Sequence, residues 1–337
     1  MKHTLPLLAA LLAPLTPLFA EGAPFRPEPG KFPPLEKAHS YRGELTFVDH
    51  TNRRGSIRIQ GNGKFRFTGP SPFAMLPYGM VRYHGAPADV RHIPTGTHMH
   101  GQFLLPMKGE EETIPPVSEK EREQNPLSRY NHAILLEDDV SFYSRRGRSW
   151  KILGTEQGGG PAPRLKLSVE PVGPDIDGGI NKTVLLDIDA STRVWKNSQI
   201  MGIDQLIPGQ QIQVNLTWGP FDSLATTDIW LDDASLKTFK EVQRQRHLRL
   251  IRSRFLPGWV DAVKNGDTGG GEVTVTFFGG MDPSLYTDIR DMQGGKRQPK
   301  ICNAETTLRT WGYHQEYATF GDILEWNAAS GRADPSE

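Results

Sequence analysis

The stretch Gly43-Glu44-Leu45-Thr46-Phe47-Val48 decides the fold, because Gly258-Trp259-Val260-Asp261-Ala262-Val263 repeats its order of glycine, aliphatic and valine positions. After a polar turn, each stretch is followed by an alternating segment, at 56–59 in the first case and at 272–277 in the second. Such alternation places one face of a strand on a core and the other face in water. The two stretches therefore predict a β module, led by a hairpin, that occurs more than once.

A middle copy is weaker but present, with Gly147 and Ile152 as its opener and an alternating segment at 165–169. Two further pairs of segments repeat along the chain. The acid, Arg and Trp of 189–195 match those of 305–311, and the Pro-Gly turn at 93–96 matches that at 207–209. In both Pro-Gly cases the turn leads into a strand, so we expect three related modules.

A glycine-led strand, a polar turn, more strands and a closing strand form the pattern of small closed β-barrels. The modules resemble the OB-like barrel domains of unknown function found in exported bacterial proteins, and the resemblance covers roughly residues 41–326. It implies a mainly β fold of tandem small OB-like barrels. Barrels of this type often bind oligonucleotides or oligosaccharides on one face, although a fold alone does not establish a function. No Pro-Gly turn precedes 322–326, so the sequence does not predict whether the third module closes into a barrel.

The segments between the strands complete the expected organisation. From Asp232 to Arg254 there is no Gly or Pro, and Pro257-Gly258 follows, which predicts one long basic helix. We expect a signal peptide (1–20), a Pro-rich linker (21–40), module 1 (41–106), a charged linker (107–131), module 2 (132–231), the basic helix (232–255), module 3 (256–328) and a disordered tail (329–337).

The first residues predict export to the periplasm or the medium. Lys2 precedes an apolar run at 5–19, and Ala20 offers a small residue for cleavage. The run is too short to cross a bilayer, and no later segment is apolar enough, so we expect no membrane span after cleavage. Cys302 is the only cysteine, which excludes an internal disulfide. The charges balance at 39 Lys+Arg and 39 Asp+Glu, so a nucleic-acid partner is not expected.

Histidines provide the first candidate site. Four of the ten gather between positions 84 and 100: His84, His92, His98 and His100. On a strand, His98 and His100 point to the same side, a spacing that suits zinc or copper, with His84 or His92 as a further ligand. The alternative is that the pair lines a polar sheet face or bonds to a turn.

The basic helix provides the second candidate site. Its arginines, among them Arg244, Arg246, Arg249 and Arg252, could bind an anionic polymer, either an acidic polysaccharide or a nucleic acid. The bracing role, in which they pair with acidic neighbours, is the interpretation that the neutral charge of the chain favours. For the protein as a whole, the expected partners are an acidic polysaccharide or a cell-envelope protein.

Acidic pairs at Asp138-Asp139, Asp187/Asp189 and Asp232-Asp233 raise the hypothesis of a carbohydrate-active hydrolase. No catalytic signature surrounds them, and strand ends, turns and a helix start explain them as well. The sequence therefore favours an exported, non-catalytic binding or scaffolding protein. Metal binding through the histidines is the first alternative, and hydrolysis is the second.

Overall fold

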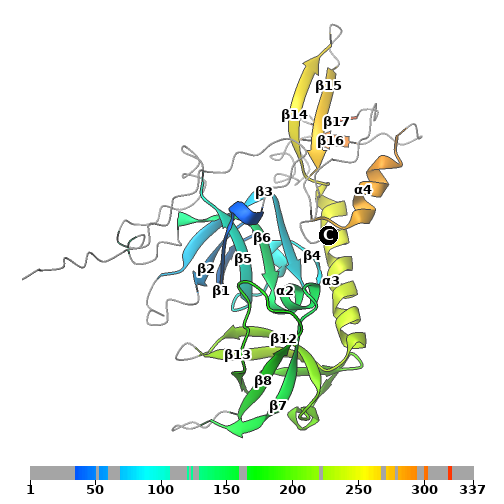
Figure 1. The fold of residues 1–337 in the computed structure, drawn as a ribbon. Helices are drawn as coiled ribbons and strands as arrows, with labels where there is room; N and C mark the ends of the chain where they lie inside the picture. Colours follow the sequence, from blue (N-terminus) through cyan, green and yellow to red (C-terminus); the bar gives the residue numbers. More distant parts are fainter. Residues whose placement is uncertain are drawn as a thin grey trace, which may run out of the picture.

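The computed structural model describes residues 35–50, 53–59, 69–106, 120, 123, 129–158, 165–219, 223–266, 271–277, 280–293, 300–302 and 318–320. This part of the chain is mainly β structure and contains two closed five-stranded barrels, with a long helix alongside them (Figure 1). The expected fold class is confirmed. The expected signal peptide and tail, and most of both expected linkers, lie outside the described residues.

The first barrel is a closed ring in which the third and fifth strands pair in parallel. The sheet order is β2-β1-β5-β6-β3-β4, and an additional β2–β3 pairing closes the ring. Only the β3–β6 contact is parallel. The elements are β1 (His39–Asp49), β2 (Arg54–Ile59), β3 (Ser71–Tyr83), β4 (Ala86–Ala88), the short 3-10 helix η2 (Val90–His92), β5 (His98–Leu104) and β6 (His132–Asp138). Another 3-10 turn, η1 (Leu35–Lys37), precedes β1.

The second barrel has the same connections. Its order is β11-β10-β13-β12-β7-β8-β9, and the parallel β9–β13 pairing closes it. In both barrels the first strand pairs with the second and fourth, and the third pairs with the second and fifth, which is the OB topology. The elements are β7 (Ser149–Gln157), β8 (Leu165–Val172), β9 (Val184–Ile188), β10 (Arg193–Lys196), β11 (Gln199–Met201), η5 (Ile203–Gln205), β12 (Gln211–Trp218) and β13 (Leu224–Trp230).

In both barrels the repeated Pro-Gly turn forms a backbone hydrogen bond with the first strand at the β-bulge of that strand. Gly96 N–H donates to the carbonyl of Leu45 and Gly209 N–H to that of Ile152, each at 2.7 Å. The two glycines have φ angles of +91° and +88°, a region that L side chains rarely adopt. The similarity read from the sequence at these turns therefore reflects one shared backbone contact.

The boundary between the two barrels differs from the expected one. Residues 132–138 were expected to open module 2, yet they form β6, which pairs with β3 and β5 and so completes the first barrel. The charged stretch at 107–131 lies between the fourth and fifth strands of one barrel. A long connection between two strands adds little closure cost, because that cost grows only with the logarithm of the number of residues. The boundary is instead the short helix α2 (Asp139–Arg145), which leads from β6 to β7.

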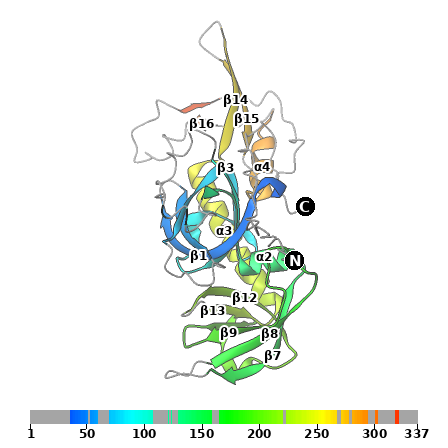
Figure 2. The same cartoon turned by 60° about the vertical axis from the view of Figure 1, so that its left-hand side comes forward.

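The predicted basic helix is α3 (Asp233–Arg254), which begins at the N-cap Asp232. Figures 1 and 2 show it running alongside both barrels. Phe239 contacts the rings of Trp195 and Trp230 in the second barrel, and Gln243 Nε2 donates to the carbonyl of Pro87 in the first at 3.3 Å. In the described part of the chain, no helix has the length and apolarity needed to span a membrane.

The third expected module is described in part. The hairpin of β14 (Gly258–Asn265) and β15 (Gly271–Phe277) is followed by α4 (Pro283–Arg290) and by the short pair β16 (Lys300–Cys302) and β17 (Ala318–Phe320). Among these described residues the strands form two separate two-stranded sheets, so closure of a third barrel is not seen in them.

Candidate functional site

The candidate site lies where β6 ends and α2 begins, at the junction of the two barrels. Asp138 is the N-cap of α2, and its side chain accepts a hydrogen bond from Ser141 N–H at 3.1 Å. Asp139 is the first residue of the helix. Neither residue is accessible to solvent. The turn therefore places two neighbouring carboxylates inside the protein.

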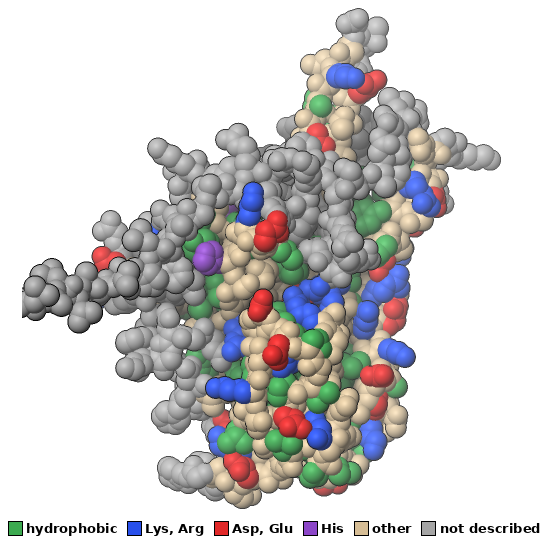
Figure 3. Space-filling model, viewed as in Figure 1, with side chains coloured by type: hydrophobic (Ala, Val, Ile, Leu, Met, Phe, Trp, Pro, Cys, Tyr) green, Lys and Arg blue, Asp and Glu red, His purple; other side chains and the backbone are tan. Residues whose placement is uncertain are grey.

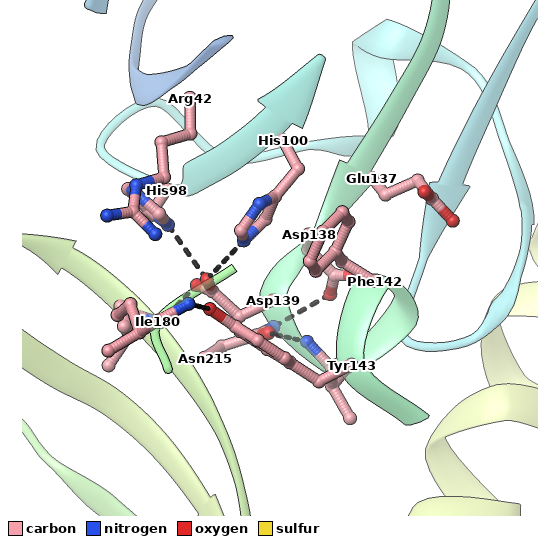
Figure 4. A network of polar contacts seen from close by, with 12 residues as sticks. Arg42, His98, His100, Glu137, Asp138, Asp139, Phe142, Tyr143, Ile180 and Asn215 are labelled. Carbon is pink, nitrogen blue, oxygen red and sulfur yellow. Dashed lines mark hydrogen bonds and ion pairs between the residues drawn. The ribbon is translucent and has the colours of Figure 1, made fainter. Parts of the chain in front are cut away.

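His98 and His100 of β5 both reach Asp139, as Figure 4 shows. The same carboxylate oxygen, Oδ1, accepts hydrogen bonds from His98 Nδ1 at 2.8 Å and from His100 Nε2 at 3.0 Å. Met99, between them, points into the core of the first barrel. The alternation expected on this strand is present, and the second barrel together with α2 covers the face that carries the histidines.

The same two carboxylates also bind the second barrel. Asp139 Oδ2 accepts from the backbone N–H of Leu216 at 3.0 Å. Asn215 Nδ2 donates to Asp138 Oδ2 at 2.8 Å, and Asn215 Oδ1 accepts from Val140 N–H at 2.9 Å. A β-bulge falls between Asn215 and Leu216 and breaks the regular ladder of β12 there. We call these residues the seam: His98, His100, Asp138, Asp139, Asn215 and Leu216.

A backbone contact extends the seam beside its side chains. Thr97 and Thr217 form an isolated antiparallel bridge between the barrels, and Thr217 Oγ1 donates to the carbonyl of Gly96 at 2.6 Å. The Pro-Gly turn of the first barrel thus contacts both its own first strand and the second barrel.

Burial and hydrogen bonds set the charge of three seam residues, Asp138, Asp139 and His100. Burial alone would raise the pKa of Asp139, but His98 and His100 more than offset this and hold its pKa below the ordinary value. Burial lowers the pKa of His100 to about 4, and the bond to Asp139 offsets only part of that effect. Burial raises the pKa of Asp138 to about 6, against hydrogen bonds from Ser141, His84 and Asn215 that favour its charged form. At neutral pH the seam therefore holds ionised carboxylates and a neutral His100.

Aromatic rings surround the polar seam on the α2 side. The ring of His100 stacks on Phe142, with centroids 3.8 Å apart, and meets Tyr143 edge-on. Tyr143 Oη in turn accepts from Ile180 N–H of the second barrel at 3.0 Å. Figure 4 shows Arg42 of β1 beside His98. These rings exclude water, which strengthens the hydrogen bonds inside.

No protein-family model matches this chain, and no curated protein matches it in sequence.

Two of the four predicted metal ligands lie away from the seam side chains. The ring of His84 packs against Tyr83, Trp230 and Phe239, and only its backbone N–H reaches Asp138, at 3.0 Å. His92 lies on η2, where Nδ1 faces Asp89 N–H at 3.2 Å and Gln243 Nε2 at 3.1 Å. Burial lowers the pKa of each imidazole to about 4.

Within the described ranges, His98, His100 and Asp139 are the one group of three whose ligand atoms lie close enough to share a metal ion, all within 4.8 Å of one another. The two histidines were expected from the sequence, and the carboxylate replaces His84 or His92 as the third group. The set suits zinc or copper in its donor types. However, the ring nitrogens that would bind the metal already hydrogen-bond to the same carboxylate oxygen, so a bound metal would replace both hydrogen bonds.

The predicted arginines of α3 divide into two kinds. Arg244 Nη2 donates to Asp282 at 3.2 Å and Arg252 Nη2 to Asp288 at 3.2 Å, which ties α3 to α4 and its cap. Arg246 donates to the carbonyl of His92 at 3.4 Å. Arg249 is exposed, and no ion pair connects it to an acid in the part of the chain that the structure describes. Figure 3 shows basic and acidic side chains interspersed along this side of the molecule.

Sequence reasoning missed the role of Asp139, Asn215 and Leu216. Asp138-Asp139 was interpreted as the end of a strand and the start of a turn, which describes its position but not its partners. The available signal was a run of three acids, 137–139, directly after the apolar run 133–136, and all seven residues are buried. Acids next to a buried strand need partners, because an unpaired buried charge is costly.

Proposed function

We propose that this chain is an exported, non-catalytic binding or scaffolding protein of the cell envelope or the extracellular space, built on two barrels held in one fixed arrangement. The seam supports this proposal. Asp138 and Asp139 each accept three hydrogen bonds, from donors that belong to both barrels and to α2. A buried polar network whose members are all satisfied favours one arrangement over its neighbours. The outer faces of the two barrels then keep one fixed orientation relative to each other.

The acidic pairs support structural roles better than hydrolysis. Asp138 and Asp139 are sealed from solvent, so a substrate cannot reach them in this conformation. Asp187 pairs with Lys166 at 3.1 Å, and Asp232 caps α3 through Ser235 N–H at 2.7 Å. Each carboxylate thus has a local partner that explains its position, and the hydrolase hypothesis is the less favoured one.

The ligand class that we propose is an acidic glycan bound along α3. Lys237 and Arg249 are exposed, and the described part of the chain offers neither an acidic partner. At the rise of an α-helix their positions are separated by about 18 Å along the axis of α3. Two cations at that separation suit an extended anionic polymer better than a small anion.

Retention on a heparin resin tests this ligand class. We expect the chain from residue 21 onward to bind at low salt, and a Lys237→Glu/Arg249→Glu variant to elute at a clearly lower salt concentration. The matched control is Lys264→Glu/Arg290→Glu, which changes the net charge equally, at exposed residues that already pair with Glu272 and Asp291. Equal loss in both variants, or no retention of the parent chain, would show that α3 is not a glycan site.

Export is tested separately. We expect the protein recovered from the periplasm or the medium of an expressing bacterium to begin at Glu21. Recovery only in the cytoplasm with an intact N-terminus would contradict export and would leave the glycan test unaffected.

Metal binding at the seam is the second candidate function, favoured by the convergence of His98, His100 and Asp139. The test is elemental analysis of protein purified without chelator or histidine tag. Near-stoichiometric zinc or copper that disappears in His98→Ala/His100→Ala, but remains in His92→Ala, would support it. A folded protein that contains no metal and takes up none from added zinc or copper would exclude it.

A further inference from the structure

The hairpin β14–β15 and helix α4 follow α3 in the chain, and we call these three elements the arm. The chain enters the arm from the end of α3, and residues 280–285 return to pack on α3 and on the first barrel. Figure 1 shows the hairpin projecting away from both barrels, with α4 beside the end of α3 that leads into it. The arm is thus held by a chain connection at one place and by a docked surface at another.

Phe255 makes the chain connection in a strained backbone conformation. It is the C-cap of α3, with φ of 71° and ψ of 155°. This region is essentially restricted to glycine, and a residue with a Cβ atom persists there only when the surrounding structure holds it. The strain at Phe255 therefore works against the docked position of the arm, and it is relieved when the arm moves.

The docked surface is centred on Asp282, the N-cap of α4. Its carboxylate accepts a hydrogen bond from Arg244 Nη2 of α3 at 3.2 Å. Leu285, on the first turn of α4, packs on apolar side chains of α3. Gly280 lies so close to Met80 of β3 that a Cβ atom would have no room there. The close approach explains one glycine of the double-glycine segment that precedes α4.

His247 of α3 makes this surface sensitive to protons. The backbone N–H of Asp282 faces its Nε2 at 3.4 Å, and because a backbone N–H can only donate, Nε2 must be the unprotonated nitrogen. Nδ1 then carries the proton, and it is buried without a hydrogen-bond partner among the described residues. A second proton would set an N–H against that of Asp282 and place a charge in a site that is 1% exposed. Burial accordingly lowers the pKa of His247 to about 4.

The charged groups that face this imidazole from the neighbouring elements keep their charge in mildly acidic solution. Burial alone would raise the pKa of Asp282, but hydrogen bonds from Arg244 and from α4 more than offset this and hold it below the ordinary value. Burial would likewise raise the pKa of Asp89 at the start of η2, but bonds from Arg91 bring it to about 2. His92 of η2 does titrate, since burial lowers its pKa to about 4. The cations near the two imidazoles are arginines, which stay protonated: Arg91, Arg244 and Arg246.

We propose that acidification releases the arm from α3, with His247 as the latch and Phe255 as the hinge. Protonation of the ring removes the acceptor that Asp282 N–H uses, and relief of strain at Phe255 favours the released position. The seam contacts do not involve Asp282, so the two barrels keep their arrangement when the arm moves. The device is independent of the proposed ligand and of metal binding.

Hydrogen exchange of the full chain, read by mass spectrometry and corrected for the intrinsic pH dependence of exchange, tests the proposal. A helix of 8 residues is marginal on its own, so the amides of α4 exchange when the arm is released. Between pH 6.5 and 4.5 we expect the protection of α4 to fall by about thirtyfold, the ratio expected when a pKa of 6.5 in the released arm becomes about 4 in the docked arm. Strand β6, in the first barrel, should keep its protection over the same range.

Two pairs of variants separate the latch from the hinge. His247→Gln supplies an acceptor that does not titrate, so the protection of α4 should become independent of pH, whereas the control His92→Gln should keep the pH dependence. Phe255→Gly adopts the hinge conformation without strain. It should protect α4 several times better than Phe255→Ala, which also lacks the ring but retains the Cβ atom.

A measurement on the unaltered chain completes the test. The NMR signal of the His247 ring should titrate well below pH 6.5, and a ring that titrates at its ordinary value would overturn the latch. A fall in α4 protection that persists in His247→Gln would also overturn it, as would loss of β6 protection in step with α4, which assigns the change to unfolding of the whole protein. Equal protection in Phe255→Gly and Phe255→Ala would overturn the hinge.

Discussion

Replacing Asp139 with alanine tests whether the seam stabilises the protein. The carboxylate accepts hydrogen bonds of 2.8 Å from His98, 3.0 Å from His100 and 3.0 Å from Leu216 N–H, and it is inaccessible to solvent. Its loss leaves three buried donors without this acceptor, and each such donor costs about 1–3 kcal/mol. The desolvation cost of the carboxylate is removed at the same time, which offsets part of the loss. We therefore expect the free energy of unfolding to fall by about 3–5 kcal/mol.

Urea unfolding followed by tryptophan fluorescence measures this change, because Trp150 and Trp230 are buried in the second barrel. The exposed Asp177 provides the matched control, and Asp177→Ala should change the free energy of unfolding by less than about 0.5 kcal/mol. Asp139→Asn should fall between the two, since its oxygen can still accept from the histidines while its amide faces the N–H of Leu216. A loss below about 1 kcal/mol for Asp139→Ala would refute the view that the seam holds the barrels together.

Three further outcomes follow from the structure. Asn215→Ala should lower the free energy of unfolding by about 2–4 kcal/mol, and its effect should not add to that of Asp138→Ala, as a double-mutant cycle in urea would show. Gly209→Ala should lower it by about 1–2 kcal/mol because φ is +88°, whereas Gly154→Ala, with open space around the new methyl group, should change it little by the same assay. Acidification from pH 7 to 4.5 should lower the melting temperature, because burial holds the pKa of several histidines at about 4, below 6.5, so the unfolded chain binds more protons in that window. Asp138 has a pKa raised from 3.8 to about 6, so between these pH values the folded chain binds more protons at this group and acidification stabilises it. This is one group, whereas four histidines have the destabilising effect: His84, His92, His100 and His247.

The fold was largely predictable because its repeats are local in sequence. A glycine, an aliphatic residue and a valine at fixed spacing mark the bulged first strand, and the Pro-Gly turns mark the contact with that strand. Both signals depend on the backbone conformation of a few adjacent residues. The boundary at 131 was wrong because composition cannot distinguish a long connection between two strands of one barrel from a linker between two barrels. Only the pairing of β6 with β3 and β5 decides it.

The site was predictable only in part, for a related reason. The alternation of a strand places His98 and His100 on the same side, and the structure agrees. Their partner Asp139 is 39 residues beyond His100, and Leu216 is 77 residues beyond Asp139. These distances along the chain are bridged by strand pairing and by the contact of two barrels, neither of which leaves a periodic signal. A candidate metal cluster and a structural seam therefore look alike in the sequence.

The polar composition of the seam also restricts how far the two barrels can move relative to each other. An apolar contact between two barrels tolerates sliding, because hydrophobic burial has no direction. Here the contact is made by carboxylates with three donors each, and a displacement of either barrel would leave buried charges without partners. Helix α3 adds a second tie, since it packs on Trp195 and Trp230 of one barrel and bonds to Pro87 of the other. Because these two ties lie at different places, hinge motion about either one is opposed by the other. The two barrels and α3 are therefore held in one arrangement, which is what the proposed scaffold for an extended ligand would require.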